Sequence, residues 1–359
     1  MLSRQRDLES VRARLASWLR ERLPSARGLA VSALQAPGAG FSNESLLFDL
    51  TYESEGRAHV EPLVVRLTPE EFRVFPEYDL ARQFHVMRAL GSTAVPVPCV
   101  RWLEEDAGVL GSPFFVMDRI AGEIPSEVPP YHTVGFCFEA TPEGRARTWW
   151  SGIEVLARIH TLDWRALGLG FLGVPGGGTD PLDRQLAYYT RYLEWARGPE
   201  PQPILEATLA WLRANRYVPA RVALCWGDSR LPNVIFRDDA VAAVLDWEMA
   251  FLGDPEADLG WWLFMDWHHS VGTGIERLPG LPGRDETIGR YEALTGVAAT
   301  HVLYNEVLAA LRFGAILVKV AANLAAAGIP IAGPDLATNN ACTRRLAEIL
   351  GLPPPGEPG

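Results

Sequence analysis

The sequence is poor in lysine and cysteine and has no long apolar run. Its only lysine is Lys319, so the other members of the 33 Lys and Arg residues are arginines. The four cysteines lie far apart, without the paired spacing of a zinc site or a disulfide-rich domain, a pattern typical of reduced cytoplasmic thiols. No segment offers about twenty uninterrupted apolar residues, so we expect no membrane partner.

An excess of acidic residues argues against one class of function. The 44 Asp and Glu residues outnumber the 33 Lys and Arg residues and give a net charge of −11 at pH 7. Proteins that bind nucleic acid hold its phosphates with clustered Lys and Arg. The composition therefore predicts no nucleic-acid partner, and it is compatible with a cationic ligand without requiring one.

The length of 359 residues and the hydrophobic content of 48% suit a globular protein of one bilobal unit or two domains. Near the N-terminus, apolar residues recur at helical spacing among charges, which predicts an amphipathic helix packed on the fold and not a signal peptide. We expect further helices at residues 78–90, 146–163, 182–196, 204–213, 255–265, 286–294, 302–327 and 336–350, and strands at residues 29–34, 45–52, 60–67, 234–236 and 241–245.

The most informative segment is Trp-Gly-Asp-Ser-Arg-Leu-Pro-Asn at residues 226–233. Phosphoryl transfer needs a carboxylate that orients the substrate hydroxyl and oxygen ligands that hold Mg²⁺ against nucleotide phosphates. In the kinase catalytic loop an Asp is followed by an Asn after four intervening residues, and a metal-binding Asp lies beyond. Asp228 and Asn233 have this spacing, and Asp246 is expected at the end of the second strand of the next hairpin. This joint pattern predicts a phosphoryl-transfer site.

Each acidic residue also has an ordinary structural interpretation. A single Asp in a loop is most often solvated or a helix cap. Asp254 stands before Pro255, which is typical of a helix start. We therefore expect structural roles for Asp254 and Asp258, and the role of Glu248 stays open.

The segment 226–258 resembles the aminoglycoside phosphotransferase (APH) family of small-molecule kinases, in the branch associated with acyl-CoA dehydrogenases. The matching residues are Gly227-Asp228, Arg230, Asn233, Leu245-Asp246-Trp247-Glu248, Gly253-Asp254-Pro255 and Asp258. The resemblance implies that Asp228 is the catalytic base or the carboxylate that orients the substrate. It implies that Asn233 and Asp246 are Mg²⁺ ligands. Arg230 stands where many protein kinases have a lysine, and we expect it to stabilise charge in the transition state.

The resemblance also implies an α+β, bilobal protein-kinase-like fold. Residues 1–117 would form an N-terminal nucleotide-binding lobe with an antiparallel sheet, one main helix and the leading amphipathic helix. Residues 118–122 would form the hinge. Residues 123–359 would form a larger, mostly helical lobe with the catalytic loop and the substrate site.

A glycine-rich segment between the first two expected strands is the candidate phosphate-binding loop. Glycine lets backbone N–H groups approach phosphate oxygens. Glycines in a hairpin are more often plain turn residues, but the resemblance extends here and favours nucleotide binding by Gly38, Gly40, Phe41, Ser42 and Asn43.

Other nucleotide contacts are expected on the third strand and at the hinge. Arg66 takes the place of the usual lysine and can hold phosphate oxygens with a planar fork of donors; its alternative is a strand-end arginine in solvent. The resemblance places Met117 beside the adenine, with Asp118 and Ile120 contacting it through their main chains.

Two departures from the family pattern bear on activity. Gln83 stands where a glutamate normally anchors the cation of the third strand, and Gln83 cannot form an ion pair. Trp226 replaces a common histidine at a position that mostly braces the loop. Glu77 or another nearby acidic residue is the alternative partner for the third-strand cation.

We therefore expect an ATP-dependent or GTP-dependent, Mg²⁺-dependent phosphotransferase that acts on a hydroxyl of a small molecule. The acceptor could be an aminoglycoside-like antibiotic or another hydroxylated metabolite. The alternative is a pseudokinase-like protein that binds nucleotide or metabolite without turnover. We expect a cytoplasmic protein, and the sequence makes no prediction of its oligomeric state.

Overall fold

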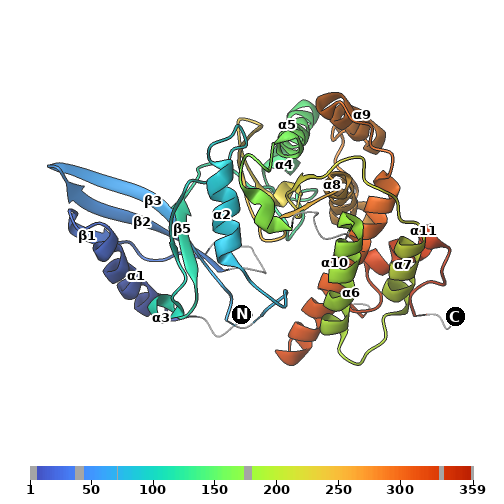
Figure 1. Ribbon diagram of the computed structural model, residues 1–359, viewed down its shortest axis with the longest axis horizontal. Helices are drawn as coiled ribbons and strands as arrows, with labels where there is room; N and C mark the ends of the chain where they lie inside the picture. Colours follow the sequence, from blue (N-terminus) through green and yellow to red (C-terminus); the bar gives the residue numbers. More distant parts are fainter. Residues whose placement is uncertain (1–5, 37–43, 71, 174–179, 331–334, 357–359) are drawn as a thin grey trace. The chain divides into compact units, whose positions relative to one another are not determined.

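The computed structural model describes residues 6–36, 44–70, 72–173, 180–330 and 335–356. The chain divides into two compact units, which are described separately (Figure 1). The first unit comprises residues 1–92 and 97–121, and the second comprises residues 93–96 and 122–359. The boundaries proposed for a hinge at residues 118–122 stay predictions.

The first unit contains an antiparallel sheet in the order β1-β2-β3-β5-β4. Burial alternates along the first part of β2, as a strand with one face on a core requires. The helix α1 packs its apolar face on that core, because Leu15, Trp18 and Leu19 share a buried cluster with strand residues. The elements are α1 (Leu8–Arg22), β1 (Arg27–Val31), β2 (Glu44–Ser54), β3 (Arg57–Leu67), α2 (Leu80–Leu90), β4 (Val100–Glu104), α3 (Ala107–Leu110) and β5 (Phe114–Asp118).

The second unit is mostly helical, with two short two-stranded sheets, β6-β9 and β7-β8, among its described residues. Its strands are β6 (Ala223–Cys225), β7 (Val234–Arg237), β8 (Ala240–Val244) and β9 (Phe251–Gly253). Its helices are α4 (Phe136–Glu139), α5 (Pro142–Thr161), α6 (Pro181–Arg197), α7 (Pro203–Ala214), α8 (Glu256–His269), α9 (Arg284–Thr295), α10 (Val302–Ala326) and α11 (Ala341–Leu350).

The expected α+β kinase-like fold is confirmed, and three helix boundaries are wrong by four or more residues. The helix expected to begin at residue 146 begins at Pro142 as α5, and the helix expected to end at residue 265 ends at His269 as α8. A helix was expected from residue 336, but α11 begins at Ala341. Asn340 explains this start, because its side-chain oxygen accepts the backbone N–H of Thr343 at 3.0 Å and so caps the helix. Residue 335 precedes a turn, in which the Asp335 carbonyl accepts from Asn339.

The helix α10 is long and apolar enough to cross a membrane by length and composition alone. Of its most apolar window, 56% is buried inside the protein. Its buried residues include Asn305 and Arg312, and it packs against α6 and α8. These are the properties of the central helix of a folded unit.

Candidate active site

The strand β6 leads directly into the catalytic segment, which we define as residues 226–246. Gly227 at its start has a φ of +90°. A Cβ atom there would lie 2.1 Å from the carbonyl oxygen of Met249. Only glycine fits both this conformation and this close approach, so the glycine of the Gly-Asp pair shapes the turn that presents Asp228.

The carboxylate of Asp228 is buried and is held by three N–H donors. Its Oδ2 accepts from Asn233 Nδ2 at 2.7 Å and from Arg230 Nε at 3.0 Å. Its Oδ1 accepts from the indole Nε1 of Trp261 at 2.8 Å. A carboxylate has about four lone-pair sites. Three are used by the protein, which leaves room for one further donor such as a substrate hydroxyl.

The guanidinium of Arg230 lies between two carboxylates. It contacts Asp228 through Nε and forms an ion pair with Glu127 through Nη1. Burial acts to lower the pKa of Arg230, but the negative charges of Asp228, Glu127 and Asp246 outweigh it and raise that pKa. Arg230 is thus a fixed cation. Its expected role in the transition state stays a prediction.

The two expected metal ligands are brought together by the backbone. The Leu245 N–H donates to the Asn233 carbonyl at 2.9 Å, so Asp246 follows a residue bonded to Asn233. Because Asn233 donates its Nδ2 to Asp228, its Oδ1 is turned away from that carboxylate. Asp246 has a φ of +58°, a left-handed conformation that Asp tolerates. Mg²⁺ prefers oxygen ligands, and the side chains of Asn233 and Asp246 both supply them.

Asp258 anchors the start of the catalytic segment from the first turn of α8. It is fully buried, and it accepts the backbone N–H of Trp226 at 2.6 Å and of Gly227 at 2.8 Å. His160 Nε2 lies 3.0 Å from the same carboxylate. The structural role expected for Asp258 is confirmed. Asp254 also fits the expectation, since it accepts the Glu256 N–H at the helix start.

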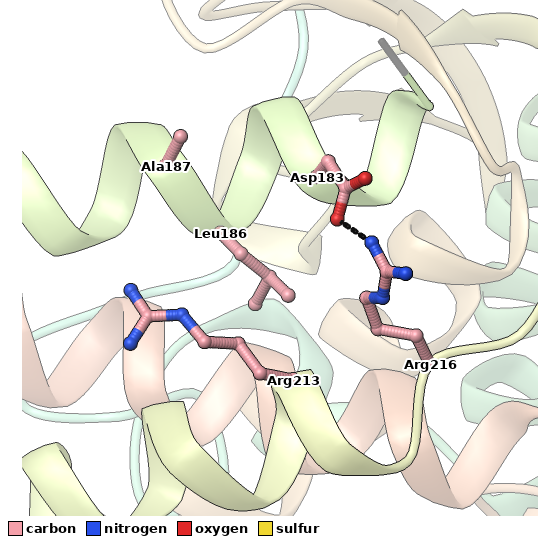
Figure 2. Close-up of a pocket in the computed structure, with 5 residues that line it drawn as sticks. All are labelled: Asp183, Leu186, Ala187, Arg213 and Arg216. Carbon is pink, nitrogen blue, oxygen red and sulfur yellow. Dashed lines mark hydrogen bonds and ion pairs between the residues drawn. The ribbon is translucent and has the colours of Figure 1, made fainter.

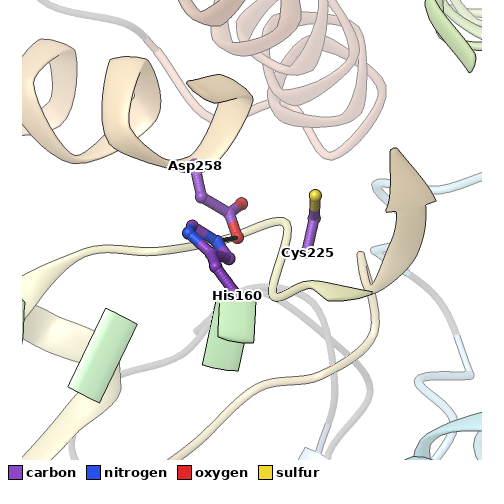
Figure 3. A group of neighbouring side chains, drawn as sticks. All are labelled: His160, Cys225 and Asp258. Carbon is purple, nitrogen blue, oxygen red and sulfur yellow. Dashed lines mark hydrogen bonds and ion pairs between the residues drawn. The ribbon is translucent and has the colours of Figure 1, made fainter. Parts of the chain in front are cut away.

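His160, Cys225 and Asp258 place potential metal-ligand atoms within 4.8 Å of one another (Figure 3). Both His160 nitrogens are engaged, one by Asp258 and the other by Tyr291 at 2.7 Å. Burial raises the pKa of the Cys225 thiol well above its usual value, so the sulfur stays protonated and is a poor ligand. His160, Asp258 and Tyr291 therefore form a hydrogen-bonded brace, with the Cys225 thiol beside it.

Trp226 braces the other end of the segment. Its indole Nε1 donates to the carbonyls of Leu245 at 2.8 Å and Asp246 at 3.2 Å. This confirms the bracing role expected at the position where the family commonly has histidine. The contact fixes the backbone of the predicted metal ligand Asp246.

The residues predicted to bind nucleotide belong to the first unit. Gly38, Gly40, Phe41, Ser42 and Asn43 lie outside the described residues. Arg66 lies in β3, opposite Ser45 of β2 and Phe115 of β5, and the buried Gln83 lies in α2.

The predicted adenine contacts lie at the end of β5. Met117 is buried and Ile120 follows the strand. The Asp118 N–H already donates to the Cys99 carbonyl at 2.9 Å, so a main-chain contact from Asp118 to adenine would use its carbonyl. These assignments stay predictions.

A cavity of about 360 Å³ is lined by residues of α6, of α7 and of the turn after α7 (Figure 2). An ion pair between Asp183 and Arg216 spans it, and Arg213 on α7 donates to Thr190. No residue of the catalytic segment lines it. We therefore do not assign it to the acceptor.

Three residues that contact Gly227, Asp228 or Arg230 were not assigned to the site from the sequence. Glu127 lies 103 residues before Arg230 in the chain, and Arg312 lies 85 residues after Gly227, whose carbonyl it contacts. Trp261 lies in an aromatic stretch of the sequence, residues 261–267. A run of two tryptophans in a helix was the available signal, but it does not tell which indole faces a carboxylate.

His268 and His269 end α8. Burial lowers the pKa of His268 to about 4, with a further contribution from the Arg230 charge. Burial also lowers the pKa of His269 well below its usual value, and the charges of Arg230 and His268 add to this effect while Asp266 opposes it. Both imidazoles are therefore neutral at pH 7.

His269→Phe is expected to reduce the loss of stability on acidification. Above pH 6.5 the histidine is neutral in both states; below it, only the unfolded chain takes up the proton, so stability falls as the pH falls. For a group that stays neutral when folded, this amounts to about 2 kcal/mol between pH 8 and pH 5. Urea unfolding followed by tryptophan fluorescence at both values measures it. His59→Phe, a partly exposed histidine, is the control, and equal acid losses for parent and His269→Phe would contradict the prediction.

A kinase-like fold with a buried Gly-Asp segment, an Asn five residues on and an Asp after the next hairpin defines a phosphotransferase of the small-molecule kinase class. The model of the phosphotransferase enzyme family (APH) matches residues 33–294, and the chain belongs to this family. The resemblance inferred from the catalytic motif is therefore confirmed.

Acyl-CoA dehydrogenase family member 10 of Mus musculus is 33% identical over 203 residues, which make up 55% of this chain and 18% of that protein. The chain thus spans less than a fifth of the length of this relative. A putative aminoglycoside phosphotransferase from Ralstonia eutropha JMP134 has a similar structure, with a TM-score of 0.67 and 26% identity over 94% of this chain and 98% of that chain.

A thermostable mutant of APH(4)-Ia, solved as a ternary complex with ADP and hygromycin B, has a TM-score of 0.56 and 16% identity. The match covers 94% of this chain and 98% of that chain. At this identity the likeness shows the fold alone.

Proposed function

We propose that the protein transfers the γ-phosphoryl group of ATP or GTP to a hydroxyl group of a small molecule and requires Mg²⁺. The observation that carries the proposal is the buried Asp228 carboxylate, fixed by Trp261, Asn233 and Arg230 with about one lone-pair site left. A carboxylate held in this way can orient a hydroxyl for in-line attack. The ADP complex of the fold relative supports the use of a nucleotide.

In the proposed reaction, the acceptor oxygen forms a bond to the γ-phosphorus while the bond from that phosphorus to the β,γ-bridging oxygen breaks. The hydroxyl proton passes to Asp228, and the nucleoside diphosphate leaves with the electron pair of the broken bond. Mg²⁺, when bound, would neutralise phosphate charge. Asn233 and Asp246 would hold it through oxygen atoms, and Arg66 of the first unit is proposed to pair with the phosphates.

The pairing of two acidic residues of the second unit, Glu127 and Asp266, favours an acceptor with few positive charges. Glu127 is paired with Arg230, and Asp266 is held by Arg277 at 2.6 Å and by Tyr131 at 2.6 Å. A polycationic aminoglycoside needs unpaired carboxylates, and these carboxylates already have partners. We propose a hydroxylated metabolite in the cytoplasm, in agreement with four unpaired thiols.

The test is nucleotide consumption across a panel of hydroxylated compounds that includes neutral, anionic and polycationic members, with ATP and GTP compared. Stimulation by a hydroxylated compound, with a phosphorylated product in the mass spectrum, is the expected result. If no compound stimulates turnover while nucleotide still binds, the protein is a binding protein without transfer.

Asp246→Asn is expected to raise the Mg²⁺ concentration for half-maximal activity at least tenfold, because a neutral amide is a weaker ligand for a hard cation than a carboxylate. Asn tolerates the left-handed backbone at this position, so the turn should persist. Mg²⁺ titration of the initial rate measures the effect. Asp238→Asn is the matched control, since it is exposed in the same hairpin region with a φ of +53°. Identical Mg²⁺ curves for Asp246→Asn and the parent would rule out the ligand role.

A further inference from the structure

Trp261 and Arg312 reach the turn that carries Asp228 from two different helices: Trp261 contacts the Asp228 carboxylate, and Arg312 contacts the Gly227 carbonyl and the Trp261 ring. Trp261 lies on α8 with 1% of its surface exposed, and its Nε1 is 2.8 Å from Asp228 Oδ1. Arg312 lies on α10 with 1% exposed, and its guanidinium carbon is 4.2 Å from the centroid of the Trp261 ring. We propose that these two residues form a positioning relay that fixes Asp228 for phosphoryl transfer; this inference rests on the proposed function.

The surroundings of Arg312 explain how the indole is held. Its Nη2 donates to the Gly227 carbonyl at 2.5 Å, and its Nε donates to the Tyr189 hydroxyl at 3.0 Å. These acceptors are neutral, so a buried cation is stabilised here by dipoles and aromatic faces. The rings of Phe313 and Trp261 pack in a T-shaped arrangement with their centroids 6.1 Å apart. The ring is therefore restrained, and its N–H points at Asp228.

The relay holds Oδ1, the second oxygen of the Asp228 carboxylate. Asn233 holds Oδ2 from within the catalytic segment, whereas Trp261 holds Oδ1 from α8. Without the indole N–H the carboxylate is freer to turn about its Cβ–Cγ bond. Small misplacements of a catalytic group cost large factors in rate. Arg312 contributes twice, because it also holds the Gly227 carbonyl next to Asp228.

The adjacent Trp262 shows what a packing tryptophan looks like in the same helix. It is 2% exposed, and its indole N–H has no hydrogen-bond partner among the described residues. Its ring packs 5.5 Å from that of Trp149, and against Gly152, where a Cβ would come within 2.4 Å of it. Trp262 thus provides an internal control with equal burial and without the contact to Asp228.

The test compares Trp261→Phe with Trp262→Phe, using Mg·ATP with water as the acceptor and, once found, the stimulating compound. Trp261→Phe should lower kcat roughly 10- to 100-fold and leave the KM for ATP within about threefold. Trp262→Phe should keep kcat within about threefold, because it loses packing but no hydrogen bond. An unchanged kcat for Trp261→Phe, or equal losses in both variants, would overturn the relay.

A double-mutant cycle with Asp228→Asn separates positioning from a general effect on folding. If Trp261 acts through Asp228, Trp261→Phe should change the residual rate of Asp228→Asn by less than about twofold. A full additional loss in that background would show that Trp261 acts elsewhere. Arg312→Lys, which keeps the charge but not the fork of donors, should retain more activity than Arg312→Met.

A spectroscopic readout keeps the relay testable without turnover. With ¹⁵N-labelled tryptophan, the indole proton of Trp261 should exchange slowly and shift when Asp228 becomes Asn, while that of Trp262 should not shift. If the parent phosphorylates no acceptor, the proposed function fails. The indole proton signal of Trp261 then tests the contact with Asp228 by itself. No shift at Trp261 overturns the relay, whatever the activity. If the parent is active and Trp261→Phe has the same kcat, the relay is overturned but the proposed function is not.

Discussion

Asp228→Asn is expected to lower kcat about 1,000-fold while nucleotide affinity stays within about threefold. The amide cannot take up the hydroxyl proton. It also places an NH₂ group among the three N–H donors that now hold the carboxylate, so at least one contact is lost. Arg230 keeps its partner Glu127, which limits the structural disturbance. A coupled nucleotide assay and titration calorimetry measure the two quantities.

The control for this variant is Asp238→Asn, which makes the same chemical change at an exposed residue close in the chain. It should keep the parental kcat and nucleotide affinity. Rates for Asp228→Asn close to those of the parent, with the same acceptor, would remove Asp228 from the role of base. A joint loss of nucleotide binding and thermal stability would instead point to misfolding, and circular dichroism tells the two apart.

Local contacts of the site could be predicted because they depend on short spacing. Asp228 and Asn233 are five residues apart, with Pro232 between them, and their side chains meet at 2.7 Å. Leu245 is tied to Asn233 across the expected hairpin. A turn and two short strands are enough to produce this arrangement, and the sequence indicates both.

The remaining neighbours of Asp228 depend on how the helices of the second unit pack. Trp261 is 33 residues from Asp228, and Glu127 is 103 residues from Arg230. The apolar residues of α8 predict a buried helix. Burial extends, however, to every residue from Glu256 to Asp266, so no face of this stretch is exposed. The pattern therefore does not tell which of Trp261 and Trp262 faces the carboxylate. Only the crossing of α8 and α10 decides this.

The fold class could be predicted from the sequence through its individual helices and strands. The predicted start of a helix was wrong where a capping side chain, and not the apolar periodicity, sets the first residue, as Asn340 does for α11. Arg66 and Gln83 lie in a strand and a helix of the first unit, as expected. Their action on a nucleotide depends on chemistry that periodicity does not report, and it stays a prediction.

Asp258→Asn is expected to destabilise the second unit by about 3 kcal/mol, because it leaves buried donors unpaired. The carboxylate accepts from two backbone N–H groups and lies 3.0 Å from His160, with no exposed surface. An amide keeps one acceptor oxygen and turns its NH₂ toward another donor. Urea unfolding followed by tryptophan fluorescence measures the loss.

The control is Asp285→Asn in the first turn of α9, where the side chain is 95% exposed and the change should stay within about 0.5 kcal/mol. A loss below about 1 kcal/mol for Asp258→Asn would contradict the anchoring role. The same anchor orients Gly227, and Gly227 orients Asp228. Activity per folded molecule should therefore fall as well, although Asp258 would touch neither nucleotide nor acceptor.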